Sequence, residues 1–320
     1  MPAEPAAGMR RIALKVDVDT LRGTREGVPN LVALLERIGV NASFLFSLGP
    51  DNTGRAIRRV FRRGFLGKVR RTSVVSQYGL VTLLYGTLLP GPHIGRKCGA
   101  ILKDVAQRGF ETGIHVYDHV RWQDGVASAD LAWTREQLRR AVEEYQAIFG
   151  SRALIHGAAG WQVNSYVPAL QQEFGIEIAS DVRGSGPFLP SFAGKVVGPV
   201  QLPTTLPTLD ELIGRTDLAL RDPIEHLLSL TAVEPRQDHV YSLHAEIEGA
   251  AYLAAFERLL TEWRRQGYEL GTLTELGGSL RRADLPRCPI GSRAVPGRSG
   301  TVAWQGESVL SREDCPSGHQ

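Results

Sequence analysis

The stretch RIALKVDVD at residues 11–19 alternates apolar and polar side chains, which predicts a strand with two different faces. Every second residue from 12 to 18 is apolar, while Lys15, Asp17 and Asp19 share the opposite face. The strand therefore ends in two carboxylates on one side.

Over the rest of the chain, to about residue 273, short apolar runs alternate with segments whose apolar residues recur at helical spacing. The predicted strands span residues 42–47, 110–115, 152–156, 176–180, 196–202, 239–244 and 268–273. The predicted helices span residues 29–38, 99–108, 130–148, 165–174 and 250–265, and further helices are predicted between residues 209 and 233. Alternation of this length predicts a parallel sheet, either closed into a barrel or open.

Composition narrows the class of protein. The 320 residues are 42% apolar and 22% charged, which excludes a mostly disordered chain, and the net charge of +3 gives no reason to expect a nucleic-acid partner. Three scattered cysteines are too few for a disulfide framework or a cysteine zinc site. Residues 1–10 lack the apolar core of a signal peptide, so we expect a loose extension on a cytoplasmic protein.

Chemically active side chains gather at the carboxyl ends of the predicted strands, the edge where barrels and open α/β sheets hold their active sites. They are Asp17, Asp19, His115, His119, Asp181 and His244. Each one alone is equally typical of a solvated loop or a structural histidine. Their common edge favours a functional site.

The chemistry of this set suits a mononuclear metal hydrolase. Asp19, His115 and His119 provide three ligands and leave positions open for water. Asp17 is then a candidate base, and His244 a candidate acid for the leaving group. Nitrogen and oxygen ligands suit one divalent ion, either zinc, cobalt or manganese.

These motifs resemble those of the NodB-type polysaccharide deacetylases, carbohydrate esterase family four. The matching motifs are Asp17-Val18-Asp19, His115-x-x-x-His119 and Leu243-His244, in that order. The resemblance implies a distorted, incomplete (β/α) barrel, with an open doubly wound sheet as the other possibility. It also implies the same roles for the five residues: first Asp as base, second Asp and paired histidines as metal ligands, late His as acid.

Longer strings are similar to one deformylase branch of this family. They are RGTREGVP at 22–29, AAGW at 158–161, LPT at 206–208 and HAEIEG at 244–249. The resemblance implies hydrolysis of undecaprenyl-phosphate-linked 4-deoxy-4-formamido-L-arabinose at the cytoplasmic face of the bacterial inner membrane, for lipid A modification and polymyxin resistance. A different N-acylated sugar, a soluble amide, or a non-catalytic glycolipid-binding role stay open.

One motif departs from the family pattern. The arginine that usually opens the third motif and orients the base is replaced by His156. We expect Arg183 to position Asp17 in its place, with help from Asp181. The alternative is a surface ion pair.

Further candidates concern the substrate. Arg22 and Arg25 precede a predicted helix start at residues 28–29, an arrangement that suits a phosphate, although solvated loop arginines look the same. Trp161 is a candidate platform for stacking a sugar, or a packing residue.

The insertion at residues 52–103 holds eleven Lys or Arg and no Asp or Glu, and an apolar stretch follows its basic part at 74–89. This pattern favours peripheral docking on an anionic membrane, although it also fits an excursion that packs within the fold. The arginines expected at the membrane, here called the arginine quartet, are Arg58, Arg59, Arg62 and Arg63.

The last segment, residues 283–320, shows no periodicity, and 14 of its residues are Pro, Gly or Ser. We expect it to be a disordered tail. Residues 11–282 are then the catalytic domain.

Overall fold

The computed structural model describes residues 10–56, 81–213, 215, 222–235 and 237–308. Its central sheet consists of eight parallel strands in the order β10-β1-β2-β3-β4-β5-β8, with β9 also paired to β1. The strands are β1 (Arg11–Val18), β2 (Ser43–Ser47), β3 (Glu111–Val116), β4 (Ile155–His156), β5 (Ile178–Ala179), β8 (Val200–Gln201), β9 (His239–His244) and β10 (Glu269–Gly271). They form a curled half-barrel, which confirms the predicted fold class.

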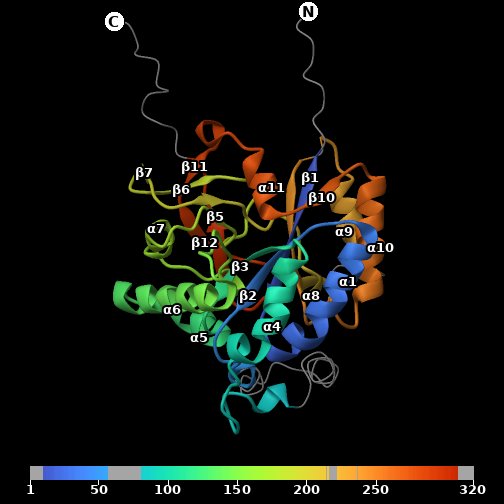
Figure 1. Cartoon of the computed structure of the whole chain (residues 1–320). Helices are drawn as coiled ribbons and strands as arrows, with labels where there is room; N and C mark the ends of the chain where they lie inside the picture. The colour runs from blue at the N-terminus through green and yellow to red at the C-terminus, as the bar shows by residue number, and fades with distance from the viewer. Residues whose placement is uncertain (1–9, 57–80, 214, 216–221, 236, 309–320) are drawn as a thin grey trace, which may run out of the picture.

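Helices cover the outside of this half-barrel. Figure 1 shows α1, α9 and α10 together along one side of the strands and α5, α6 and α7 along the other. The helices are α1 (Val28–Ile38), α4 (Ile94–Gln107), α5 (His119–Gly125), α6 (Leu131–Phe149), α7 (Val167–Glu173), α8 (Leu209–Leu212), α9 (Pro223–Thr231), α10 (Leu253–Arg265) and α11 (Leu273–Gly278). Short turns of other helix types are η1 (Gly23–Gly27), η2 (Thr82–Leu84), η3 (Val126–Ser128), η4 (Ala159–Trp161) and η5 (Arg282–Asp284).

The two faces of β1 enter different environments, as the alternation predicts. Leu14 and Val16 lie in the large core between the strands and the helices, which includes α1, α4 and α10. Ala13 lies in a second cluster with Leu45 and Leu202 on the opposite face. Because Lys15, Asp17 and Asp19 alternate with the first set, they are carried on the second face.

One expectation about the strands is wrong. The strand predicted at 196–202 is divided into β7 (Lys195–Val196) and β8, because Gly198 adopts a left-handed φ of +93° between them. β7 pairs with β6 (Leu189–Phe192), which also pairs with β11 (Arg287–Cys288).

The tail is not disordered from residue 283 onward, contrary to our expectation. β12 (Ile290–Ala294) and β13 (Thr301–Gln305) form an antiparallel hairpin. The hairpin is held by the main chain of Arg183, whose N–H donates to Ala303 O (2.9 Å) and whose carbonyl accepts from Gln305 N–H (2.8 Å). These hydrogen bonds use only the backbone groups of one distant residue. They therefore require no periodic pattern of apolar side chains from which the hairpin could be predicted. Residues 309–320 lie outside the described residues.

The basic part of the insertion, residues 57–80 with the arginine quartet, also lies outside the described residues. Where the description resumes, Val81 is 57% exposed and Leu88 is 80% exposed. Within the described ranges, no helix has both the length and the apolar character needed to cross a membrane.

Candidate metal centre

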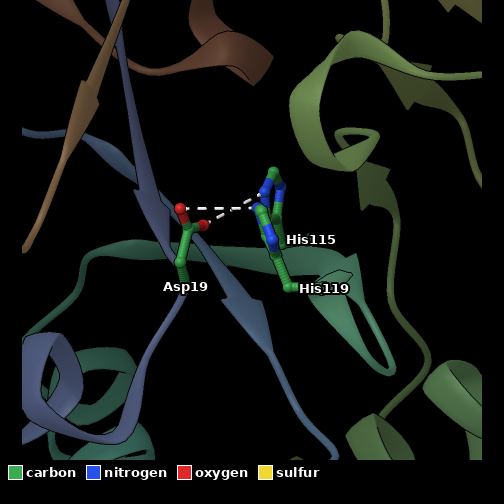
Figure 2. Close-up of side chains that lie close together, drawn as sticks. All are labelled: Asp19, His115 and His119. Atoms are coloured by element: carbon green, nitrogen blue, oxygen red, sulfur yellow. Dashed lines mark ion pairs between the residues drawn. The ribbon is translucent and has the colours of Figure 1, made fainter. Parts of the chain in front are cut away.

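Three predicted ligands meet at the carboxyl edge of the sheet. Asp19 follows β1, His115 lies on β3 and His119 is the first residue of α5. Asp19 Oδ1 is 3.3 Å from His115 Nε2, and Asp19 Oδ2 is 3.4 Å from His119 Nε2, as Figure 2 shows. One ligand atom from each residue lies within 4.8 Å of the others, a spacing that suits a single cation with bonds of about 2.0–2.2 Å.

Local backbone structure aims these side chains. The register of β2 and β3 shifts so that Phe46 faces Ile114 and Ser47 faces Val116, which leaves His115 as the extra residue of a bulge. His119 begins a helix because the Asp118 carboxylate accepts from Arg121 N–H (3.0 Å). A bulge and a helix start therefore bring both imidazoles to one point.

The electrostatics of the three residues fit a cation. Burial alone raises the pKa of Asp19, but the adjacent His119 and His115 outweigh burial and hold this pKa well below its usual range. Burial lowers the pKa of His119, which favours the neutral imidazole that a metal requires. Asp19 Oδ1, which faces His115 Nε2, is buried without a hydrogen-bond partner among the described residues. This unsatisfied oxygen is consistent with a metal site.

The loop after β1 is fastened by a glutamate that the sequence analysis missed. Glu246 Oε1 accepts from Asp19 N–H (3.1 Å), Thr20 N–H (2.8 Å) and the Thr20 hydroxyl (2.7 Å). A Cβ at Gly23 would lie 2.0 Å from the same oxygen, and a Cβ at Gly27 would lie 2.0 Å from Ala245 O. The segments 22–29 and 244–249 therefore pack directly against each other. This close packing explains why positions 23 and 27 require glycine.

Lys15 contacts the candidate base. Its Nζ lies 3.3 Å from Asp17 Oδ2 and donates to Ser180 O (3.0 Å), and the side chain is fully buried. Asp17 Oδ1 lies 3.5 Å from His115 Nδ1, one of the three candidate ligands Asp19, His115 and His119, here called the metal triad. The only signal in the sequence is a lysine within an apolar strand, two residues before Asp17.

The expectation that Arg183 positions Asp17 is wrong. Arg183 Nη1 contacts both carboxylate oxygens of Glu211 (2.8 and 3.0 Å), and its Nη2 donates to Leu206 O (3.0 Å). Asp181 does not assist either, because its carboxylate is buried within a separate hydrogen-bonded network. Its partners there are His156 Nδ1 (2.7 Å), Gln171 (2.8 Å), Gln201 (2.9 Å) and Ala158 N–H (2.9 Å).

Trp161 is a packing residue rather than an open platform. It is only 2% exposed, and its indole N–H donates to Thr204 Oγ1 (3.1 Å). The guanidinium groups of Arg298 and Arg183 lie 4.3 and 5.1 Å from its ring centroid. The ring therefore contacts cations of the protein, and the expected stacking on a sugar is wrong.

Arg22 and Arg25 lie on η1 and its approach, directly after the metal triad's aspartate. Arg22 Nε pairs with Glu26 (2.8 Å). Arg25 is exposed, and its positive charge partly offsets the rise that burial causes in the pKa of the Cys98 thiol on α4. Their expected contact with a phosphate stays a prediction.

His244 faces the metal triad from the neighbouring strand. It pairs in register with Asp17 across β9 and β1, and its Nδ1 lies 3.6 Å from Asp210 Oδ1 on α8. Burial lowers the pKa of His244, but the carboxylates of Asp210, Asp19 and Asp17 outweigh burial and raise it to about 9. A histidine held protonated is suited to donate a proton. Asp210 carried no recognisable signal in the sequence.

Solved structures share this architecture. A Mycobacterium smegmatis protein named as a polysaccharide deacetylase matches with a TM-score of 0.61 at 16% identity, over 92% of this chain and 97% of that one. A CE4 family pseudoenzyme from Bacillus anthracis matches with a TM-score of 0.51 at 14% identity, over 85% and 66%. The half-barrel is therefore that of CE4 deacetylases, and its edge carries three residues that could hold a metal ion.

Curated relatives define the particular family, although no family model matches the chain. A protein from Shewanella sediminis (strain HAW-EB3) is 34% identical over 305 residues, 95% of this chain and 98% of its own length. One from Wigglesworthia glossinidia brevipalpis is 32% identical over 284 residues, 88% and 98%. Both are named "Probable 4-deoxy-4-formamido-L-arabinose-phosphoundecaprenol deformylase ArnD". The chain belongs to this ArnD family.

Proposed function

We propose that this chain is a metal-dependent deformylase that hydrolyses undecaprenyl-phosphate-linked 4-deoxy-4-formamido-L-arabinose to the 4-amino lipid and formate. The observation that carries the proposal is the assembly of Asp19, His115 and His119 beside Asp17, which pairs in register with His244 on the adjacent strand. The chain that carries them is 34% identical to a named deformylase over 95% of its length. The new amine adds positive charge, which fits lipid A modification against cationic peptides such as polymyxin.

The protein side chains divide the proton transfers. A bound divalent ion, either zinc, cobalt or manganese, would activate water and polarise the formyl oxygen. Asp17 accepts the proton of the attacking water, since Lys15 holds one carboxylate oxygen and leaves Oδ1 beside the metal triad. His244 gives its proton to the departing sugar nitrogen while Asp210 faces its other ring nitrogen.

Arg22 and Arg25 are the residues that we propose to contact the substrate phosphate. They follow Asp19 on the chain, and Arg25 is exposed. A formamide and a phosphodiester on one pyranose ring lie only a few bonds apart, so cations close to the metal triad suit this substrate.

We also propose peripheral docking on the anionic cytoplasmic face of the inner membrane, because the polyprenyl chain keeps the substrate in the bilayer. Eight Lys or Arg occur between Arg55 and Arg71, and each can add ~1 kcal/mol near an anionic leaflet. The exposed Val81 and Leu88 provide apolar contact next to this basic part.

Docking is tested by replacing the arginine quartet with Gln. The variant should sediment less with anionic vesicles and lose activity on the lipid substrate, while a short-chain soluble analogue is processed normally. Equal losses on both substrates would show that the segment supports the fold instead.

The activity itself is tested by mass spectrometry of the formamido-arabinose lipid after incubation with the protein and each metal. We expect loss of the formyl mass, release of formate, and no reaction with a chelator or with His119→Ala. Turnover of the N-acetyl analogue or a soluble amide in place of the formamide would identify another deacetylase of this fold. Binding of the lipid without turnover under every metal would identify a glycolipid-binding protein.

A further inference from the structure

The carboxyl-terminal hairpin of β12 and β13 packs closely against α8, the helix whose Asp210 faces the candidate acid His244. The turn between β12 and β13 approaches the main chain of Glu211 so closely that a Cβ at Gly297 would lie 2.5 Å from Glu211 O. Gly297 also has a left-handed φ of +88°, which only glycine adopts without strain. The close contact and the left-handed φ of Gly297 therefore fix where the backbone of the next residue, Arg298, lies.

Arg298 reaches from this turn to two carboxylates. Its Nε donates to Glu211 Oε1 (2.6 Å), and its Nη2 donates to Asp210 Oδ2 (3.2 Å). The Cζ atom of the guanidinium lies over the Trp161 ring, 4.3 Å from the centroid, and the side chain is 16% exposed. The two carboxylates and the ring together hold the guanidinium in place.

The two oxygens of Asp210 have different partners. Oδ1 accepts from the Thr208 hydroxyl (2.5 Å) and faces His244 Nδ1 (3.6 Å), whereas Oδ2 pairs with Arg298. Asp210 lies on α8, which is a single turn of four residues and has little stability of its own. Arg298 therefore sets the rotation of the carboxylate that faces His244.

We propose that Arg298 is a positioning residue for the acid His244, acting through Asp210, so that the carboxyl-terminal hairpin is part of the active site. This inference rests on the proposed function for the role of His244. The guanidinium does not reach the reacting atoms. It keeps Asp210 Oδ1 aimed at the imidazole, so that the other ring nitrogen carries the proton for the leaving group.

The test compares Arg298→Gln with Arg293→Gln in the metal-loaded full chain. Arg293 is a matched control, because it is exposed on the same hairpin and stacks on Trp304 at 4.6 Å, away from Asp210. Partners of this kind contribute about 10–100-fold to activity, so Arg298→Gln should lower kcat by at least about 10-fold with KM within about 2-fold. The metal content of both variants should equal that of the wild type, and so should the kcat and KM of Arg293→Gln.

A double-mutant cycle separates this role from general support of the fold. If Arg298 acts through Asp210, adding Arg298→Gln to the Asp210→Asn variant should lower kcat almost no further. Additive losses, a loss confined to KM, or a kcat equal to that of Arg293→Gln would each overturn the proposal. Arg298→Lys keeps the charge and should recover part of kcat, and it replaces the Gln variant if that one does not fold.

A spectroscopic readout keeps the inference distinct from the proposed function. The ¹⁵N chemical shifts of the His244 imidazole in the zinc-loaded protein should change in Arg298→Gln and not in Arg293→Gln, whether or not the formamido-arabinose lipid is the substrate. Unchanged shifts would refute the positioning role. An inactive wild type with changed shifts would refute only the proposed deformylation.

Discussion

Replacing Lys15 by Met tests how the base is held. The side chains have similar length, but Met removes the ammonium group 3.3 Å from Asp17 Oδ2 and the bond to Ser180 O. Two unit charges at this distance attract by ~5 kcal/mol at an effective dielectric constant of about 20. Removing one member of a buried ion pair leaves the other uncompensated, and such changes cost about 3–5 kcal/mol. We therefore expect Lys15→Met to lower the free energy of unfolding by about 3 kcal/mol or more.

The same change should damage catalysis, because Asp17 loses the contact that fixes its carboxylate. A general base contributes about 10²–10⁴-fold, so we expect kcat to fall by at least about 10²-fold at conditions where the variant is folded. Urea unfolding followed by circular dichroism measures the first effect, and formate release measures the second.

The exposed Lys97 of α4 provides the control. Lys97→Met removes an equal charge from the surface and should change the free energy of unfolding by no more than about 0.5 kcal/mol, with normal kcat. If Lys15→Met matched this control in both stability and kcat, Lys15 would not hold the base. A loss of stability with normal kcat would assign Lys15 to the fold alone.

Three further predictions concern the metal and the protons. His119→Ala should reduce bound metal well below one ion per chain by elemental analysis and abolish turnover, and full occupancy would contradict the ligand assignment. Asp17→Asn should keep the metal but lower kcat by at least about 10²-fold. If this variant had the kcat of the wild type, Asp17 would not be the base. The pKa of His244, raised to about 9, predicts that activity declines as pH rises toward 9, and that Asp210→Asn moves this limb to lower pH. Because the unfolded pKa is about 6.5, the stabilisation from protonated His244 is complete below that pH and is lost as pH rises through about 9 in urea titrations.

The sequence by itself predicted a parallel α/β sheet and the gathering of Asp19, His115 and His119 at one edge, because both follow from local patterns. The choice of a half-barrel came from the resemblance to the NodB-type deacetylases. Alternation with a period of two decides which residues of β1 share a face, and the edge rule for parallel strands brings Asp19, His115 and His119 together. The same rule placed Asp17 and His244 at that edge, and the structure shows that their strands are adjacent and that the two residues pair in register.

Only the tertiary structure decided which charges surround these residues. The Lys15 side chain donates to the carbonyl oxygen of Ser180, the residue that follows β5, and Arg298 contacts Asp210 across 88 residues of chain. A guanidinium or an ammonium on a long side chain can reach any carboxylate within several ångströms, so sequence position does not predict its partner. The expected contact of Arg183 with Asp17, based on the replacement of the family's third-motif arginine by His156, is therefore wrong, and Arg183 pairs with Glu211. The hairpin that carries Arg298 pairs its backbone with one distant residue, and backbone pairing of that kind does not depend on side-chain identity.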